Sequence, residues 1–126
     1  MTHTPMHAIC WMEIPVRDLD AGMAFYGRVF DWDLARNDDG PNPMAAITTA
    51  DRSGVSGHLY PGTPASDGTG PTLHLVVPDR LEDAAARFEA GGGRLVSQAV
   101  EIPPGRFLYG IDPDGNSIGL FEPKAA

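Results

Sequence analysis

The sequence contains a single cysteine, Cys10, among its 126 residues. An internal disulfide is therefore excluded, and the composition fits a reducing compartment such as the cytoplasm. No apolar run approaches the roughly 20 residues that a membrane-spanning helix requires. The first residues, MTHTPMH, lack the basic and apolar segments of a signal peptide. We therefore expect a cytoplasmic protein with no membrane partner.

Positive charge is also scarce, because 9 Lys and Arg residues face 17 Asp and Glu residues, for a net charge of −8. No segment resembles a basic stripe, so we expect no nucleic-acid partner. The acidity favours a neutral or cationic ligand over an anionic one, although solubility alone also explains it. The chain has the usual size of one domain and is long enough to bury a core.

The two halves of the chain repeat one another at a spacing of 61 residues. This shift places Asp18 on Asp79, each at the expected start of a helix. It also places the turn DRSG (51–54) on the turn DPDG (112–115). The elements expected are strands at 7–15, 32–36, 44–50 and 55–60 with a helix at 20–31, and then strands at 71–77, 94–98, 106–112 and 116–122 with a helix at 80–90.

These elements predict the α+β class, with two βαβββ modules that form a curved mixed sheet around a cleft and carry their helices on the outer face. A single domain is expected over 1–126. Module 1 covers about 6–60, a linker rich in Pro, Gly and Ser covers about 61–70, and module 2 covers about 71–123.

Side chains alternate between the two faces of a strand. One set is apolar or Gly and should pack under the helices, whereas the other mixes aromatic and hydrogen-bonding side chains and should line the cleft. Cys10 falls in the first set, so we expect a buried and inert thiol. The predicted core set is Cys10, Met12, Ile14, Val55, Gly57, Leu59, Leu73, Leu75, Val77, Ile118 and Leu120, and the predicted cleft set is Trp11, Glu13, Ser56, His58, Tyr60, Thr72, His74, Ser117, Gly119 and Phe121.

Two motifs in this frame resemble the vicinal oxygen chelate superfamily, which includes glyoxalase I, extradiol dioxygenases and the bleomycin- and fosfomycin-resistance proteins. They are VRDLDAGMAFYGRVFDW (16–32) and DPDGNSIGLFEP (112–123). Together with the paired βαβββ units, the resemblance covers essentially the whole chain and is most like a poorly characterised glyoxalase-related subgroup. It implies a homodimer, but it does not transfer a reaction, because one fold carries many chemistries.

The resemblance also implies metal ligands on the first and last strands of each module, and here the sequence departs from the pattern. Three of the positions fall on Trp11, Thr72 and Gly119, none of which is a usual ligand. The fourth falls on His58 by ungapped matching, or on Gly57 when the glycines are matched. We therefore expect no metal at the family's usual site.

Glu13 and His74 occupy equivalent places in the two modules, about 7 Å further along their strands than the lost ligand positions. With His58 they form a possible displaced site for zinc, iron or nickel. Without a metal, the carboxylate and imidazole could transfer protons as catalytic groups. They could instead be hydrogen-bonded walls of a pocket. The sequence leaves these three alternatives open.

The other predicted ligand-binding residues are Trp11, Tyr109 and Phe121, which could stack on a flat or cationic molecule, and the polar residues His58 and Thr72. The preferred hypothesis is a protein that binds a small organic molecule without a metal. The alternative is a lyase or isomerase of the glyoxalase type, or a dioxygenase, that acts through its predicted catalytic carboxylate and imidazole.

Overall fold

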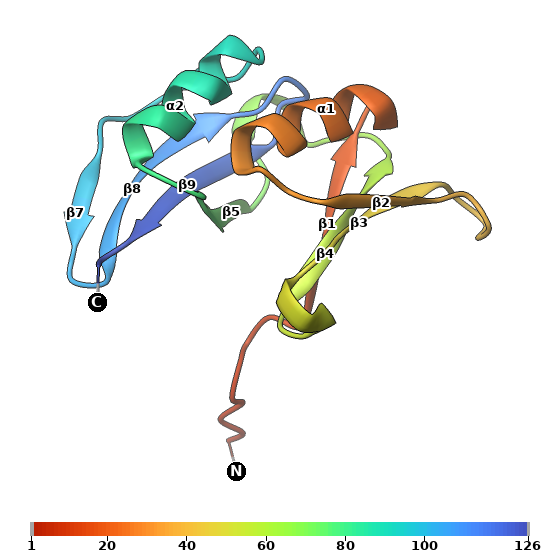
Figure 1. Cartoon of the computed structure of the whole chain (residues 1–126), viewed down its shortest axis with the longest axis horizontal. Helices are drawn as coiled ribbons and strands as arrows, with labels where there is room; N and C mark the ends of the chain where they lie inside the picture. Colours follow the sequence, from red (N-terminus) through yellow and green to blue (C-terminus); the bar gives the residue numbers. More distant parts are fainter. Residues whose placement is uncertain (1, 126) are drawn as a thin grey trace.

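The structure is a computed structural model that describes residues 2–125, and it confirms the predicted α+β class (Figure 1). The first module contains β1 (Trp11–Val16), α1 (Leu19–Phe30), β2 (Leu34–Asn37), β3 (Met44–Ile47) and β4 (Ser56–Pro61). The second contains β5 (Thr72–Val76), α2 (Leu81–Ala90), β6 (Arg94–Leu95), β7 (Val100–Ile102), β8 (Gly105–Ile111) and β9 (Ser117–Pro123).

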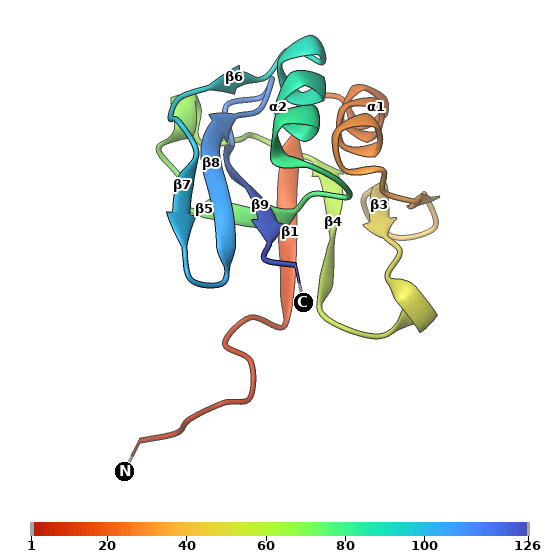
Figure 2. The same cartoon turned by 60° about the vertical axis from the view of Figure 1, so that its left-hand side comes forward.

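Each module builds its own sheet, and the two sheets have matching topology (Figure 2). The strand orders are β1-β4-β3-β2 and β5-β9-β8-β6, with β7 also paired to β8. The first and last strands of each module run parallel, and the other pairs are antiparallel. As a result, β1 and β5 are both edge strands of their sheets.

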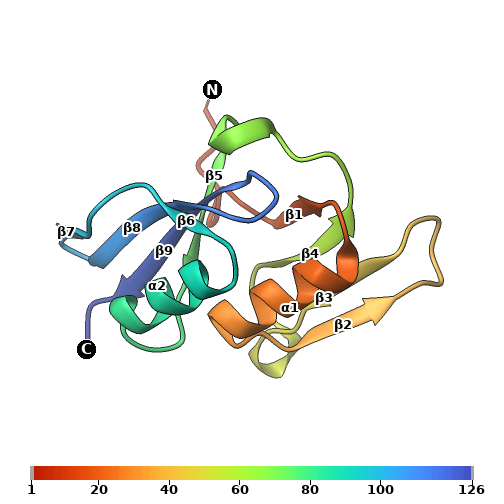
Figure 3. The same cartoon turned by 90° about the horizontal axis from the view of Figure 1, so that it is seen from above.

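The two helices lie side by side on one face of the sheets (Figures 1 and 3). Beneath them, the alternation of strand residues produces the core as predicted: Ile14 and Leu59 in the first sheet and Ile118 in the second are fully buried. The two helices contact each other through Phe25 of α1 and Phe88 of α2, whose rings pack edge to face with their centroids 5.3 Å apart. One hydrophobic core therefore spans both modules.

Helix α1 begins as the sequence predicts. The Asp18 carboxylate accepts a hydrogen bond from the backbone N–H of Ala21 at 2.9 Å, which satisfies one of the free donors at the helix start. Within residues 2–125, neither this helix nor α2 has the length and apolar character needed to cross a membrane.

Helix α2 begins differently, and the prediction that Asp79 would start it is wrong. The Asp79 carboxylate is held by two hydrogen bonds from the Arg87 guanidinium, each 2.9 Å long. Arg80 takes the N-cap position without a capping side chain. The N–H of Leu81 instead donates to the carboxylate of Glu122, at 2.7 Å. The bidentate pair with Arg87 occupies both oxygens of the Asp79 carboxylate, so this side chain does not cap the helix.

The same Glu122 belongs to an ion-pair cluster beside α2. Arg106 donates to both carboxylate oxygens of Glu82 at 2.7 Å and to Glu122 at 2.8 Å. These hydrogen bonds from Arg106 lower the pKa of Glu82 to about 2. They also lower the pKa of Glu122 below its ordinary value.

Two predicted core residues are outside the core. Cys10 and Val55 are exposed, because the first paired residues of β1 and β4 are Trp11 and Ser56. Alternation buries a side chain only where a partner strand and a covering helix are present. The strand predicted at 7–15 therefore begins four residues late, and the expectation of a buried thiol is wrong.

The strand predicted at 94–98 is shorter than expected, and the structure adds a strand that the sequence did not predict. β6 ends at Leu95, and a further strand, Val100–Ile102, follows a bulge and pairs with the same neighbour, β8. Inside the bulge, Ser97 Oγ accepts the backbone N–H of Tyr109 at 2.9 Å. A side chain thus replaces a ladder hydrogen bond at this point, which alternation of residue types does not predict.

The turn before β9 joins the modules, a role that the sequence did not reveal. Asp112 is only 3% exposed and accepts hydrogen bonds from the Tyr26 hydroxyl at 2.6 Å and from the backbone N–H of Asn116 at 2.8 Å. The side chain of Asn116 donates in turn to the carbonyl of Pro15, at 2.8 Å. Burial, with the charge of Asp112 as a second cause, raises the pKa of Tyr26 well above its ordinary value. The phenol therefore stays protonated and keeps donating.

Candidate ligand-binding site

A hollow of about 580 Å³ lies where β1 and β4 of the first module approach β5 of the second. Its volume falls within the range of about 300–1,000 Å³ that is typical of sites for small organic molecules. Side chains from both modules line it, among them Trp11, Glu13, Val55, Thr72, Leu73 and His74. The structure therefore brings together four of the predicted site residues: Trp11, Glu13, Thr72 and His74.

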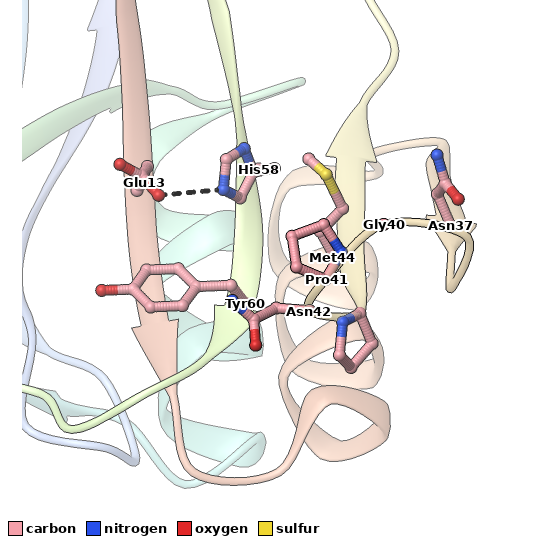
Figure 4. A pocket seen from close by; sticks show the side chains of 9 residues that line it. Glu13, Asn37, Gly40, Pro41, Asn42, Met44, His58 and Tyr60 are labelled. Atoms are coloured by element: carbon pink, nitrogen blue, oxygen red, sulfur yellow. Dashed lines mark hydrogen bonds and ion pairs between the residues drawn. The ribbon is translucent and has the colours of Figure 1, made fainter.

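A smaller hollow of about 220 Å³ opens on the other side of Glu13 (Figure 4). It is bordered by His58 and Tyr60 of β4, by Met44 of β3, and by the loop over residues 37–43. Glu13 lines both hollows and stands between them.

Three cleft residues of the first sheet form a hydrogen-bonded chain. The indole Nε1 of Trp11 donates to His58 Nδ1 at 3.0 Å, and His58 Nε2 lies 3.2 Å from Oε1 of Glu13 (Figure 4). An indole N–H can only donate, so Nδ1 must accept. A neutral His58 ring therefore carries its proton on Nε2 and donates it to the Glu13 carboxylate. Both ring nitrogens of His58 are hydrogen-bonded, so Glu13 is the available base among these three residues.

The strand register explains how this chain forms. Glu13 is the direct partner of His58 in the parallel pairing of β1 with β4, and Trp11 lies one pleat earlier on the same face. On the other side of His58, the register places Ala46 of β3, whose methyl group leaves room for the ring. The side chain of His58 is consequently 13% exposed, whereas that of Glu13 is 61% exposed.

In the second sheet, Gly119 lies where the family resemblance implies a metal ligand. The ring of His74 fills the space that a side chain at this position would occupy. The two residues are register partners, and a Cβ on Gly119 would overlap the His74 ring. That ring also meets Phe107 and Tyr109 edge to face, at 5.2 and 5.6 Å between centroids. Gly119 therefore gives the imidazole a flat surface on which to lie, and any side chain at this position would force that ring to move.

The remaining predicted residues are divided between the sheets. Tyr109 contacts His74 on the second sheet and is 37% exposed, and Phe121 is half-buried on β9. The hydroxyl of Thr72 is hydrogen-bonded to that of Ser117. Among residues 2–125, no three His, Cys, Asp or Glu side chains are grouped so that they could hold a metal. The alternative of a displaced metal site on Glu13, His58 and His74 therefore does not match this arrangement.

Comparison with known proteins agrees with this architecture. A sequence model described as the Glyoxalase/Bleomycin resistance protein/Dioxygenase superfamily matches residues 8–120. The chain belongs to this superfamily. No curated protein sequence matches it significantly.

Solved structures from the superfamily share the fold. A glyoxylase/bleomycin resistance protein/dioxygenase domain from Frankia sp. EAN1pec is 23% identical, with a TM-score of 0.70 over 95% of this chain and 100% of that one. A glyoxalase/bleomycin resistance protein from Albidiferax ferrireducens T118 is 18% identical, with a TM-score of 0.73 over 94% of this chain and 100% of that one. The fosfomycin resistance protein FosX from Listeria monocytogenes is 14% identical, with a TM-score of 0.68 over 97% of this chain and 94% of that one. At these identities the likeness shows the fold alone.

The side chains at the positions where the resemblance implies metal ligands do not offer the usual ligands of a metal. The Trp11 indole donates to His58, and the Thr72 hydroxyl is bonded to Ser117. The third position, Gly119, has no side chain and lies under His74. Among these residues, only His58 has a side chain of a kind that commonly binds metals. Both of its ring nitrogens, Nδ1 and Nε2, are already hydrogen-bonded to other residues of the protein.

Proposed function

We propose that this superfamily member binds a small organic molecule, without a metal, in the hollow between β1, β4 and β5. The observation that carries the proposal is the side chain of Trp11, which lines the 580 Å³ hollow and is 48% exposed. A large aromatic ring left open to water in a concave site gains contact area when a ligand covers it. Burial of apolar surface is worth roughly 25 cal/mol per Å².

The hollow supplies both binding area and orientation. Val55 and Leu73 form part of its apolar walls, and Glu13, Thr72 and His74 provide polar groups. The bond to His58 holds the Trp11 indole before any ligand arrives. A ring that is already oriented loses less side-chain entropy on binding, so the site is preorganised.

A second candidate function is catalysis of the glyoxalase type, as a lyase or isomerase. The specific observation in its favour is Glu13, which accepts a hydrogen bond from His58 on one oxygen and lines two hollows. Such a carboxylate could abstract a proton from a carbon next to a carbonyl group. His58 would orient it, and His74 on the facing strand would contact the substrate. The dioxygenase alternative draws no support from the metal positions.

The binding proposal is tested by titrating a library of small soluble molecules into isotope-labelled protein and mapping the resonances that shift. We expect shifts to cluster at the Trp11 indole, Thr72 and His74. Binding that shifts only the outer faces of α1 and α2 would contradict the proposal. A Glu13→Gln variant that keeps affinity for a ligand but loses its turnover would instead favour catalysis.

The homodimer and the cytoplasmic location remain predictions, made from the resemblance and the composition. We also retain the prediction that neither a nucleic acid nor a membrane is a partner.

A further inference from the structure

We propose that the ligand of this hollow is an organic cation, whose charged nitrogen contacts Glu13 and whose apolar part covers Trp11. This inference rests on the proposed function, because it names the chemical class that the same hollow would take.

The first argument is the distribution of charge. Neither hollow beside Glu13 has a Lys or Arg among the described residues that line it. Six of the eight arginines form ion pairs, and none of their partners lines either hollow. These pairs are Arg17 with Asp114, Arg36 with Asp20, Arg80 and Arg106 with Glu82, Arg87 with Asp79, and Arg94 with Asp67. With a net charge of −8 behind it, the cleft attracts cations.

The second argument is the state of Glu13. Its Oε1 accepts a hydrogen bond from the Nε2–H of His58, and within residues 2–125 no hydrogen bond reaches its Oε2. A carboxylate has about four lone-pair sites, and the Glu13 side chain is 61% exposed, so most of its accepting capacity is open to solvent or to a ligand. An ammonium group supplies both the opposite charge and N–H donors. A quaternary nitrogen supplies the charge alone.

The third argument is the position of Trp11 next to that carboxylate. Trp11 lies two residues before Glu13 on the same face of β1, and both line the larger hollow. Indole is the aromatic ring that attracts cations most strongly. Its N–H is occupied by His58, so the ring, and not the polar edge, is what remains to contact a ligand.

An anionic ligand would meet the Glu13 carboxylate in a hollow whose described lining contains no Lys or Arg to balance its charge. Helix starts are the usual anion sites of a backbone, but here both are capped within the chain. Asp18 accepts from α1, and Glu122 accepts from α2. Two imidazoles could change this balance, His74 in the hollow and His58 against Glu13, because their protonated forms would oppose a cation.

The test uses three probes of similar size and different charge, namely choline, tert-butylethanol, in which carbon replaces the charged nitrogen, and the anion pivalate. Each is titrated into the full chain at about pH 8, where imidazoles are neutral, and the shifts of the Trp11 indole and His74 resonances are followed. We expect choline to bind at least about fivefold more tightly than the alcohol, and pivalate to bind more weakly than both.

Variants assign the effect to its residues. We expect Glu13→Gln to weaken choline roughly five- to tenfold and to leave the alcohol within about twofold. Glu89→Gln makes the same chemical change on an exposed position of α2 and should change neither affinity. Trp11→Leu should weaken choline more than Trp11→Phe does, since phenylalanine keeps an aromatic face. Thermal unfolding of each variant checks that the fold is intact.

The outcomes separate the two proposals. Equal binding of choline and the alcohol in this hollow would overturn the cation inference and leave the proposed function standing. Equal loss of both probes in Glu13→Gln would also overturn it, because it would assign Glu13 a role in shape and not in charge. If none of the three probes shifts a resonance in the hollow, both the cation inference and the proposed function fail.

Discussion

The hydroxyl group of Tyr26 lies 2.6 Å from Oδ2 of Asp112, and this contact joins α1 of the first module to the turn before β9 of the second. The residues are 86 positions apart in the sequence, and both are buried. The contact is a charge-assisted hydrogen bond in a site that water does not reach, where losing one partner is costly.

We therefore expect Tyr26→Phe to lower the free energy of unfolding by about 1–3 kcal/mol, because the Asp112 carboxylate loses a buried donor. Urea denaturation measures this. Tyr109→Phe is the matched control, since it removes a hydroxyl from a ring that is 37% exposed, and it should cost less than about 0.5 kcal/mol. A Tyr26→Phe variant as stable as the control would show that the contact does not join the modules.

The packing of His74 on Gly119 predicts that substitutions at these two positions have non-additive effects on the free energy of unfolding. Gly119→Ala should destabilise the protein, because the new methyl group overlaps the imidazole. In a His74→Ala background the same change should be neutral or stabilising, since alanine costs less backbone entropy than glycine in a strand. A double-mutant cycle in urea should give a coupling of about 0.5–3 kcal/mol. Additive effects would contradict the proposed packing.

The hydrogen bond from Trp11 to His58 predicts a change in tryptophan fluorescence when His58 is replaced. His58→Leu removes the acceptor of the indole N–H, so we expect Trp11 to become more mobile and its fluorescence to shift to longer wavelength. The loss of stability should be about 1 kcal/mol or less, because the bond lies at the surface. His74→Leu is the control and should leave the emission unchanged. The second tryptophan, Trp32, stacks on Tyr26 and Phe30 and provides a constant background.

The ion pair between Arg106 and Glu82 predicts a pH dependence. The pKa of Glu82, at about 2, lies below its ordinary value, so the pair stabilises the folded chain above the usual glutamate range, and this contribution is lost as the pH falls towards 2. Arg106→Gln should raise the pKa of Glu82, but to a value still below the roughly 4.3 of a free side chain, because the backbone hydrogen bond to Glu82 remains. Carbon-detected NMR titration of Glu82 measures it.

The control for this titration is Arg80→Gln, because Arg80 lies 3.7 Å from the same carboxylate and contributes least to lowering its pKa. We expect a clearly smaller rise in that variant. An equal rise in the two variants would mean that the net positive charge near Glu82, and not the paired hydrogen bonds from Arg106, sets its titration.

Much of the fold could be predicted from local patterns. The helix over 20–31 is observed as Leu19–Phe30 and that over 80–90 as Leu81–Ala90, because their apolar residues recur at helical spacing. The sheet faces followed from alternation. The predictions were wrong where a contact between residues distant in the sequence determines the local structure. These places are the start of β1, the bulge beside Tyr109, and Asp79, which pairs with Arg87 and does not cap α2.

The site was predicted in part. Alternation placed Trp11, Glu13 and His74 on one face, and the structure brings them to one hollow. It did not predict that Trp11 and Glu13 would occupy both nitrogens of His58, because this depends on rotamers and on the small Ala46 beside the ring. Nor does a single sequence show that Gly119 is needed to accommodate His74, since the contact is made across two strands.

Within residues 2–125, β1 and β5 are the outermost strands of separate sheets, and no ladder of backbone hydrogen bonds connects them. The angle between the sheets therefore depends on the contacts between α1 and α2 and on the turn at 112–116. These contacts therefore set the separation of β1 from β5, and with it the width of the hollow between them. Substitutions in the helix interface or in this turn should change that width, and so the size of molecule that the proposed site accepts.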